Sequence, residues 1–235
     1  MPKTDHAALR QTIIDTCLKM SELGINHGTS GNVSARIPEG LLITPSGMAY
    51  DSIRPADIVL IDHEGSYEGR RVPSTEWRFH YDIMRHRPDI NAIVHNHALH
   101  CTTLACLRME IPAFHYMIAV AGGNSVRVAD YARFGTQELS DNALRALEGR
   151  TACLLANHGM IALGTDLGKA LGLAVEIENL ASCYWRCLQV TRPAILTTAQ
   201  IDEVLVRIAS YGKQPEEMAP GQMPATEAPP RRLAS

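Results

Sequence analysis

The sequence predicts an α/β fold with a mostly antiparallel sheet and helices on both of its faces. Segments with helical and with strand periodicity alternate along the 235 residues. Several connections between the predicted strands are too short for the crossovers that parallel strands require. Hydrophobic residues make up 46% of the chain, which is ample for a buried core. We expect one domain over residues 1–213 and a disordered tail over 214–235, where Pro, Ala, Glu and Arg replace any periodic pattern.

Charge and composition exclude several classes of partner. The formal net charge is -3, so no basic surplus is present for nucleic acid or for an anionic membrane. No apolar run reaches the roughly 18 residues of a membrane span, and no signal peptide is recognisable. We therefore expect a cytoplasmic protein. Six cysteines without a Cys-x-x-Cys pair predict reduced residues packed in the core, at positions 17, 101, 106, 153, 183 and 187.

The first elements follow from apolar spacing and turn residues. Residues 5–23 carry a helical stripe that ends at Gly24. Residues 26–36 are a glycine- and hydroxyl-rich loop that runs into a short alternating segment, and such a loop exposes backbone N–H groups that can hold an anion, although an ordinary turn is the alternative. Residues 41–44 and 57–62 predict strands, and the first of these breaks into a second small-residue turn.

A helix is predicted from Pro73 to the residue before Pro88. Its start contains Ser74, Thr75 and Glu76. Because helix N-termini favour anions, the two hydroxyl residues could hold a phosphate while Glu76 faces a metal ion. The alternative is that one hydroxyl is a plain N-cap and that Glu76 only offsets the helix dipole.

Two histidines end a β-branched run at 91–97. In a strand, residues i and i+2 share a face, so His95 and His97 would present their imidazoles side by side. Neutral imidazole suits zinc and its neighbours, and a catalytic zinc takes three or more protein ligands. The alternative is a pair of hydrogen-bonded histidines at a strand end.

The second half continues the alternation of helices and strands. Helices are predicted over 98–107, 136–147, 166–190 and 198–211, with a loop reaching Tyr131 in between. His100 is expected to be structural, and Glu178 in the long helix is expected to make surface or interface contacts. Residues 152–163 predict two buried strands around a tight turn, where Gly159 can take a positive φ. His158 is expected to be exposed at the tip of this turn, which makes it the candidate third imidazole.

Six ordered motifs resemble the class II aldolase and adducin family, and within it the L-fuculose-1-phosphate aldolases most. They are Gly-Thr-Ser-Gly-Asn-Val-Ser (28–34), Leu-Ile-Thr-Pro-Ser-Gly (42–47), Pro-Ser-Thr-Glu-Trp-Arg-Phe-His (73–80), Val-His-Asn-His-Ala (94–98), His-Tyr-Met-Ile-Ala (115–119) and Asn-His-Gly (157–159). The resemblance implies a three-layer α/β/α sandwich and a C4-type homotetramer with sites between subunits. It also implies a divalent metal ion, zinc first, with Mn²⁺, Co²⁺ or Fe²⁺ as alternatives.

The resemblance also implies roles for individual residues. His95, His97 and His158 hold the metal, Glu76 is a labile ligand and the catalytic acid or base, and Tyr116 of a neighbouring subunit is a proton donor. The implied phosphate-binding residues are Gly31, Asn32, Ser46, Gly47, Ser74 and Thr75. Phe134 and Tyr211 are implied to line the aldehyde side.

The implied activity is the reversible cleavage of a ketose 1-phosphate to dihydroxyacetone phosphate and a small aldehyde. The candidate substrates are the 1-phosphates of L-fuculose, 5-deoxyribulose and 5-methylthioribulose. One alternative is a pentulose-phosphate 4-epimerase of the same superfamily. Another is a non-catalytic, adducin-like interaction module, which we would expect to lack the metal ligands that this sequence retains.

Overall fold

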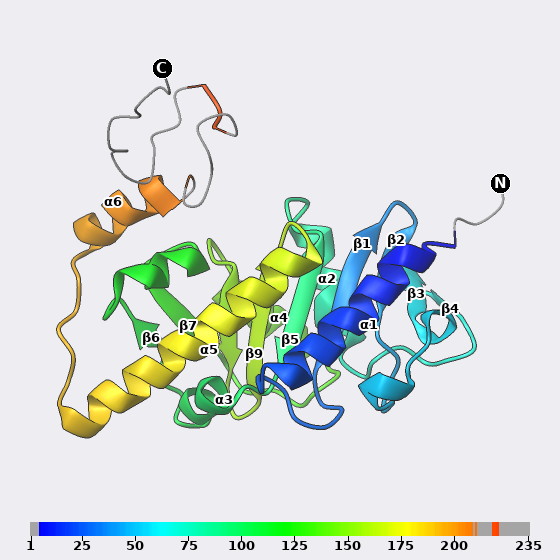
Figure 1. The fold of residues 1–235 in the computed structure, drawn as a ribbon, viewed down its shortest axis with the longest axis horizontal. Coiled ribbons are helices and arrows are strands. Elements are labelled where there is room, and N and C mark those ends of the chain that lie inside the picture. Colours follow the sequence, from blue (N-terminus) through cyan, green and yellow to red (C-terminus); the bar gives the residue numbers. More distant parts are fainter. Residues whose placement is uncertain (1–4, 209, 211–217, 221–235) are drawn as a thin grey trace, which may run out of the picture.

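A single mixed sheet forms the centre of the molecule in the computed structural model, which describes residues 5–208, 210 and 218–220 (Figure 1). The strands are β1 (Asn32–Ile37), β2 (Gly40–Ile43), β3 (Val59–Asp62), β4 (Tyr67–Glu68), β5 (Ala92–Asn96), β6 (Ile111–Pro112), β7 (Ser125–Ala129), β8 (Ala152–Leu155) and β9 (Gly159–Gly164). They lie side by side in the order β4-β3-β2-β1-β5-β9-β8-β7-β6. The strand that carries His95, β5, is therefore central.

Helices cover both faces of this sheet. The α-helices are α1 (Ala7–Glu22), α2 (Trp77–His86), α3 (Leu99–Cys106), α4 (Gln137–Ala146), α5 (Leu167–Val190) and α6 (Thr198–Ile208). Short 3₁₀ helices are η1 (Tyr50–Ser52), η2 (Pro55–Asp57) and η3 (Tyr116–Ala121). None of the helices in the described part of the chain combines the length and the apolarity that a membrane span requires.

Two cores, one on each face, make the fold a three-layer sandwich. Alternating strand residues divide between them, so that Val94 packs with α1, α3 and α5 whereas Ile93 packs with α2 and α4. Figure 1 shows α1 and α5 crossing the near face, with α2 and α4 behind the sheet. The α/β/α arrangement expected from the resemblance is confirmed.

One parallel strand pairing makes the sheet mixed, which the sequence analysis did not foresee. β7 runs parallel to β8, while the other neighbouring strands of the described sheet pair antiparallel. Residues 125–129 form β7, where we expected a loop, because the alternation in this five-residue segment is short. The connection from β7 to β8 contains α4, which makes it long enough for a parallel crossover.

Other expectations need smaller corrections. Cys17, Cys101 and Cys153 are buried as expected, but Cys106 and Cys183 are exposed. Glu178 does not project from the surface and instead makes hydrogen bonds to the start of α3. The last helix, α6, ends at Ile208. Tyr211 and most of the predicted tail lie outside the described residues.

Candidate metal centre and substrate cleft

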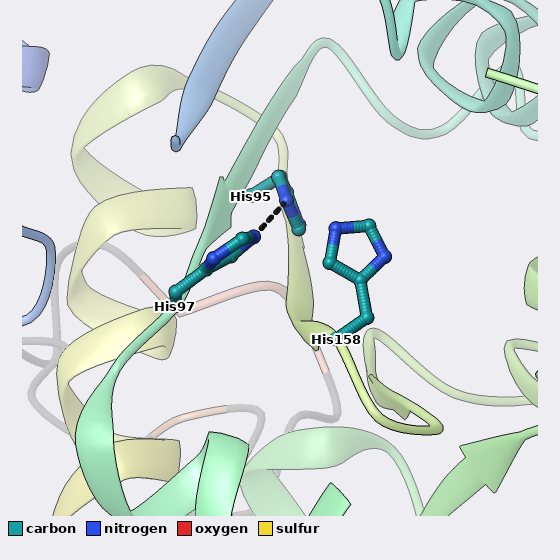
Figure 2. Close-up of side chains that lie close together, drawn as sticks. All are labelled: His95, His97 and His158. Carbon is teal, nitrogen blue, oxygen red and sulfur yellow. Dashed lines mark hydrogen bonds between the residues drawn. The ribbon is translucent and has the colours of Figure 1, made fainter. Parts of the chain in front are cut away.

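Three imidazole rings converge at the end of β5, as the sequence predicted. The nitrogens that His95, His97 and His158 offer all lie within 4.8 Å of one another. The Nε2 atoms of His95 and His97 are 3.2 Å apart, and Figure 2 shows the His158 ring facing this pair. Two residues of one strand end and one residue of a distant turn thus form a single cluster.

The approach of β9 to β5 brings His158 to the other two rings. Met160 pairs with Asn96, and a Cβ atom on Gly159 would lie 2.4 Å from the Asn96 carbonyl oxygen and 2.8 Å from Cδ2 of His97. A glycine is therefore required at 159 for close approach. The expected positive φ falls instead on Asn157, at 55°. His158 is only 14% exposed, because its side chain turns inward to the cluster instead of lying free at the tip.

Glu76 faces the same cluster from the start of α2. It is the N-cap residue of α2, which begins at Trp77 and not at Pro73. Its Oε2 lies 3.1 Å from His95 Nε2 and accepts a 2.8 Å hydrogen bond from Asn32 Nδ2. Its Oε1 lies 3.0 Å from His158 Nε2, but without hydrogen-bond geometry, so this buried oxygen has no hydrogen-bond partner among the described residues.

Ionisation of these groups favours a bound cation. Burial raises the pKa of Glu76, but the neighbouring imidazoles of His95 and His158 outweigh burial and hold that pKa well below its usual range. Burial, together with the adjacent His95 and His158, lowers the pKa of His97 to about 4. An ionised carboxylate and a neutral imidazole are the forms that bind metal ions.

The donor set fits a divalent metal ion. His95 Nδ1 is 2.9 Å from the Met160 carbonyl oxygen, to which it must donate, so in the neutral imidazole that binds metal ions Nε2 carries the lone pair that points into the cluster. Two nitrogens bound to one tetrahedral zinc lie about 3.3 Å apart, close to the separation of the His95 and His97 Nε2 atoms. Glu76 Oε1, which has no hydrogen-bond partner among the described residues, adds a further ligand atom beside them.

A second set of buried polar residues supports Glu76, and the sequence analysis did not identify it. Asn32 Oδ1 lies 2.5 Å from His80 Nε2, and His80 Nδ1 lies 2.7 Å from Ser34 Oγ. The sequence contained a signal for this set. Asn32 and Ser34 share a strand face at i and i+2, while Glu76 and His80 share a helix face at i and i+4.

A cleft of about 320 Å³ opens beside the histidines. Its lining includes Phe134, which the resemblance places on the aldehyde side, and also Tyr131, which the sequence analysis missed. The full lining is Ser30, Thr75, Glu76, His97, Tyr131, Ala132, Phe134, Asn157 and His158. Tyr116 begins η3, is 50% exposed and does not line this cleft. The other expected aldehyde-side residue, Tyr211, is outside the described part of the chain.

Most of the expected phosphate-binding residues lie on two adjoining turns. An isolated β-bridge between Pro45 and Pro73 holds these turns together, and the Ser46 N–H donates to the Val72 carbonyl oxygen. Ser46, Ser74 and Thr75 line a second cleft of about 450 Å³, and Thr75 also lines the first. Gly47 follows Ser46 in the same turn, with a φ of 66° that glycine adopts readily.

The remaining two residues of the expected phosphate set border the metal cluster. A Cβ atom on Gly31 would lie 2.8 Å from the His95 carbonyl oxygen, so glycine is required here. The Asn32 side chain bonds to Glu76 and His80, and its backbone pairs with His95 in the ladder between β1 and β5. The structure thus brings the metal-binding and anion-binding candidates to one end of the sheet.

Comparisons with known proteins agree with this arrangement. The family described as Class II Aldolase and Adducin N-terminal domain matches residues 11–185. The chain is 54% identical over 213 residues to a 5-methylthioribulose-1-phosphate/5-deoxyribulose-1-phosphate aldolase of Rhodospirillum rubrum, which covers 91% of this chain and 96% of that protein. It is 50% identical over 210 residues to an L-fuculose phosphate aldolase of Escherichia coli, covering 89% and 98% respectively.

A solved structure agrees with the sequence matches. An L-fuculose 1-phosphate aldolase superposes with a TM-score of 0.83 at 41% identity, covering 85% of this chain and 95% of that one. The chain therefore belongs to the class II aldolase and adducin family. His95, His97 and His158 lie together with Glu76 beside them, so the chain has the residues of a possible metal site.

Proposed function

We propose that this protein is a metal-dependent aldolase that reversibly cleaves a ketose 1-phosphate to dihydroxyacetone phosphate and a small aldehyde. The observation that carries the proposal is the convergence of three imidazoles and Glu76 beside a cleft that shares Thr75 with a hydroxyl-lined neighbour. The names of the close relatives support the same reaction class. An adducin-like interaction module would have no need of this cluster.

His95, His97 and His158 would hold the metal ion, and zinc is our first choice because of the three-imidazole donor set. When bound, a divalent cation supplies a Lewis acid that stabilises the negative charge left when the C3–C4 bond breaks. Ser46, Ser74 and Thr75, together with the glycine turns at Gly31 and Gly47, would hold the phosphate and so fix the other end of the substrate.

The proton transfers are assigned to two side chains. In cleavage, Glu76 delivers a proton to C3 of the dihydroxyacetone phosphate half, and in synthesis it removes that proton. Tyr116 would accept the proton of the C4 hydroxyl in cleavage and return it to the C4 oxygen in synthesis. Because Tyr116 is exposed and does not line the cleft of its own chain, we assign it to the cleft of a neighbouring subunit in a homotetramer.

The test of the reaction is direct. Zinc-loaded protein is incubated with each of the three candidate ketose 1-phosphates, and dihydroxyacetone phosphate is measured by its enzymatic reduction. We expect its release from at least one of them and little release after chelation of the metal. Inversion at C4 without release of the triose phosphate would replace the aldolase by the epimerase.

The aldehyde side supports a relaxed choice of substrate. Tyr131, Ala132 and Phe134 give the cleft an apolar wall, and an apolar wall discriminates only about 10- to 200-fold per methylene. We therefore expect kcat/KM values for the three substrates within roughly 10⁴-fold of one another. A larger preference would point to a polar contact outside this wall.

Shared sites are tested by mixing two inactive proteins. Tyr116→Phe lacks the proton donor and His95→Ala lacks a metal ligand, so a mixed tetramer would contain some sites with both groups intact. Activity should return once subunit exchange has been verified by mass spectrometry. Mixed tetramers without activity would contradict a site built across subunits.

A further inference from the structure

We propose that His80 is a positioning residue for Glu76, which it reaches through Asn32 at the end of a buried hydrogen-bond chain that starts at Ser34. None of Ser34, His80 and Asn32 lines the cleft, so their contribution is indirect. The catalytic consequence rests on the proposed function, whereas the direction of the chain does not.

The direction of the chain follows from the carboxylate at its end. An ionised carboxylate can only accept, so Asn32 must present its amide nitrogen to Glu76 Oε2, at 2.8 Å. The Asn32 oxygen is then left to accept from His80 Nε2, which must carry the proton. In a neutral imidazole the other nitrogen accepts, so the Ser34 hydroxyl donates to His80 Nδ1, at 2.7 Å.

Burial makes this direction consequential. Ser34 and His80 are fully buried and Asn32 is 4% exposed, so water is not available as a substitute partner. The fold itself places the three residues in contact, because β1 presents Asn32 and Ser34 on one face and α2 brings His80 above them. Each member therefore depends on the next for its hydrogen bond.

The chain selects one of two orientations of the Asn32 amide. With the amide rotated by half a turn, its oxygen would face the Glu76 carboxylate and its nitrogen would face the protonated Nε2 of His80. Both contacts would be repulsive, and neither group could turn to water. A fixed donor to Oε2 directs the other oxygen, Oε1, to His158. Oε1 is then the Glu76 atom that remains available for the metal ion and for proton transfer.

The first experiment determines the tautomer of His80 without reference to activity. Protein labelled with nitrogen-15 in histidine is studied by NMR at neutral pH, and the His80 signals are assigned by their loss in His80→Gln. We expect one proton-bearing nitrogen, Nε2, and a bare Nδ1. Finding the proton on Nδ1, or on both nitrogens, would overturn the chain.

The second experiment measures the effect on turnover. Ser34→Ala removes the first donor of the chain, and Ser140→Ala is its matched control, because Ser140 is equally buried but donates to Asp82 between α2 and α4. We expect Ser34→Ala to lower kcat about 10-fold, in the range of outer-shell substitutions, with KM and zinc content unchanged. Ser140→Ala should retain the wild-type kcat even where its stability falls.

A pair of substitutions at residue 80 separates positioning from packing. Gln can donate to Asn32 and accept from Ser34, so His80→Gln should retain much of the turnover. Phe fills a similar volume but can do neither, so His80→Phe should lose about 100-fold in kcat. Equal loss in both variants, or an unchanged kcat in Ser34→Ala, would overturn the positioning role. If wild-type protein cleaves no ketose 1-phosphate, the proposed function fails, while the tautomer measurement still decides the chain.

Discussion

Glu178 on α5 clamps the first turn of α3 through His100. Its Oε1 lies 2.8 Å from His100 Nδ1 and accepts from the His100 N–H at 2.9 Å, while Oε2 accepts from the Cys101 N–H at 2.9 Å. Since α3 begins two residues after His97, the clamp fixes the chain just beyond a candidate metal ligand. A contact between two helices therefore supports the metal cluster from outside.

Removing this clamp should destabilise the protein. Glu178→Ala leaves two backbone N–H groups at the start of α3 without their acceptor, and hydrogen bonds to a charged group contribute about 1.5–3 kcal/mol each. We expect a loss of at least about 2 kcal/mol in the free energy of unfolding, measured with urea. Glu176→Ala, on the same helix, is the control and should change it little. Similar losses in both would assign the effect to α5 in general.

Enlarging Gly159 should disrupt the metal cluster. An added Cβ would meet the Asn96 carbonyl oxygen at 2.4 Å and His97 at 2.8 Å, so β5 and β9 would have to separate. We expect Gly159→Ala to weaken zinc binding about 10-fold or more, measured by competition with a chelator. Gly172→Ala is the control, because no atom lies within 4 Å of its added Cβ and helical Ala is favoured by about 1 kcal/mol. Unchanged zinc affinity in Gly159→Ala would refute the close-approach argument.

Neutralising Glu76 should separate catalysis from metal binding. In Glu76→Gln the three imidazoles remain, so most of the zinc should be retained, but the proton carrier is lost. General acid–base groups contribute about 10²–10⁴-fold, and we expect kcat to fall by that factor. Zinc content by elemental analysis and turnover are measured on the same sample. A wild-type rate in this variant would move proton transfer to another group.

The metal-free protein should lose stability on mild acidification. Burial and the nearby His95 lower the pKa of His80 to about 3, and the pKa of His97 is lowered to about 4, against about 6.5 in an unfolded chain. As the pH falls from about 6.5 to about 4, the unfolded state binds protons at these residues that the folded state does not, so the free energy of unfolding decreases. Urea unfolding at several pH values after chelation measures this slope.

The matched variant for this slope is His97→Gln. It should flatten the pH dependence between about pH 6.5 and 4, because one of the two depressed groups is gone. A slope identical to that of the wild-type chain would contradict the assignment to His97.

Much of the metal cluster could be predicted because its ligands follow local rules. His95 and His97 share a strand face at a spacing of two, and Glu76 lies at a recognisable helix start. The contacts of His80 with Asn32 and Ser34 were missed because they join a strand to a helix more than 40 positions away. The parallel strand β7 was missed because its pairing with β8 depends on the whole crossover and not on its own five residues.

The central position of β5 has a kinetic consequence for the metal. His95 belongs to a strand paired on both sides, whereas His158 lies in a turn that the ladder does not include. The N–H groups of Asn157 and His158 donate to the Ala105 and Leu155 carbonyl oxygens, outside the ladder, so their amide hydrogen exchange needs only a local opening and should be faster than exchange along β5. The three ligands would then be released in a fixed order, His158 first and His95 last. The rate at which a chelator extracts the ion should therefore follow the opening of the 157–158 turn and not the global unfolding of the sheet.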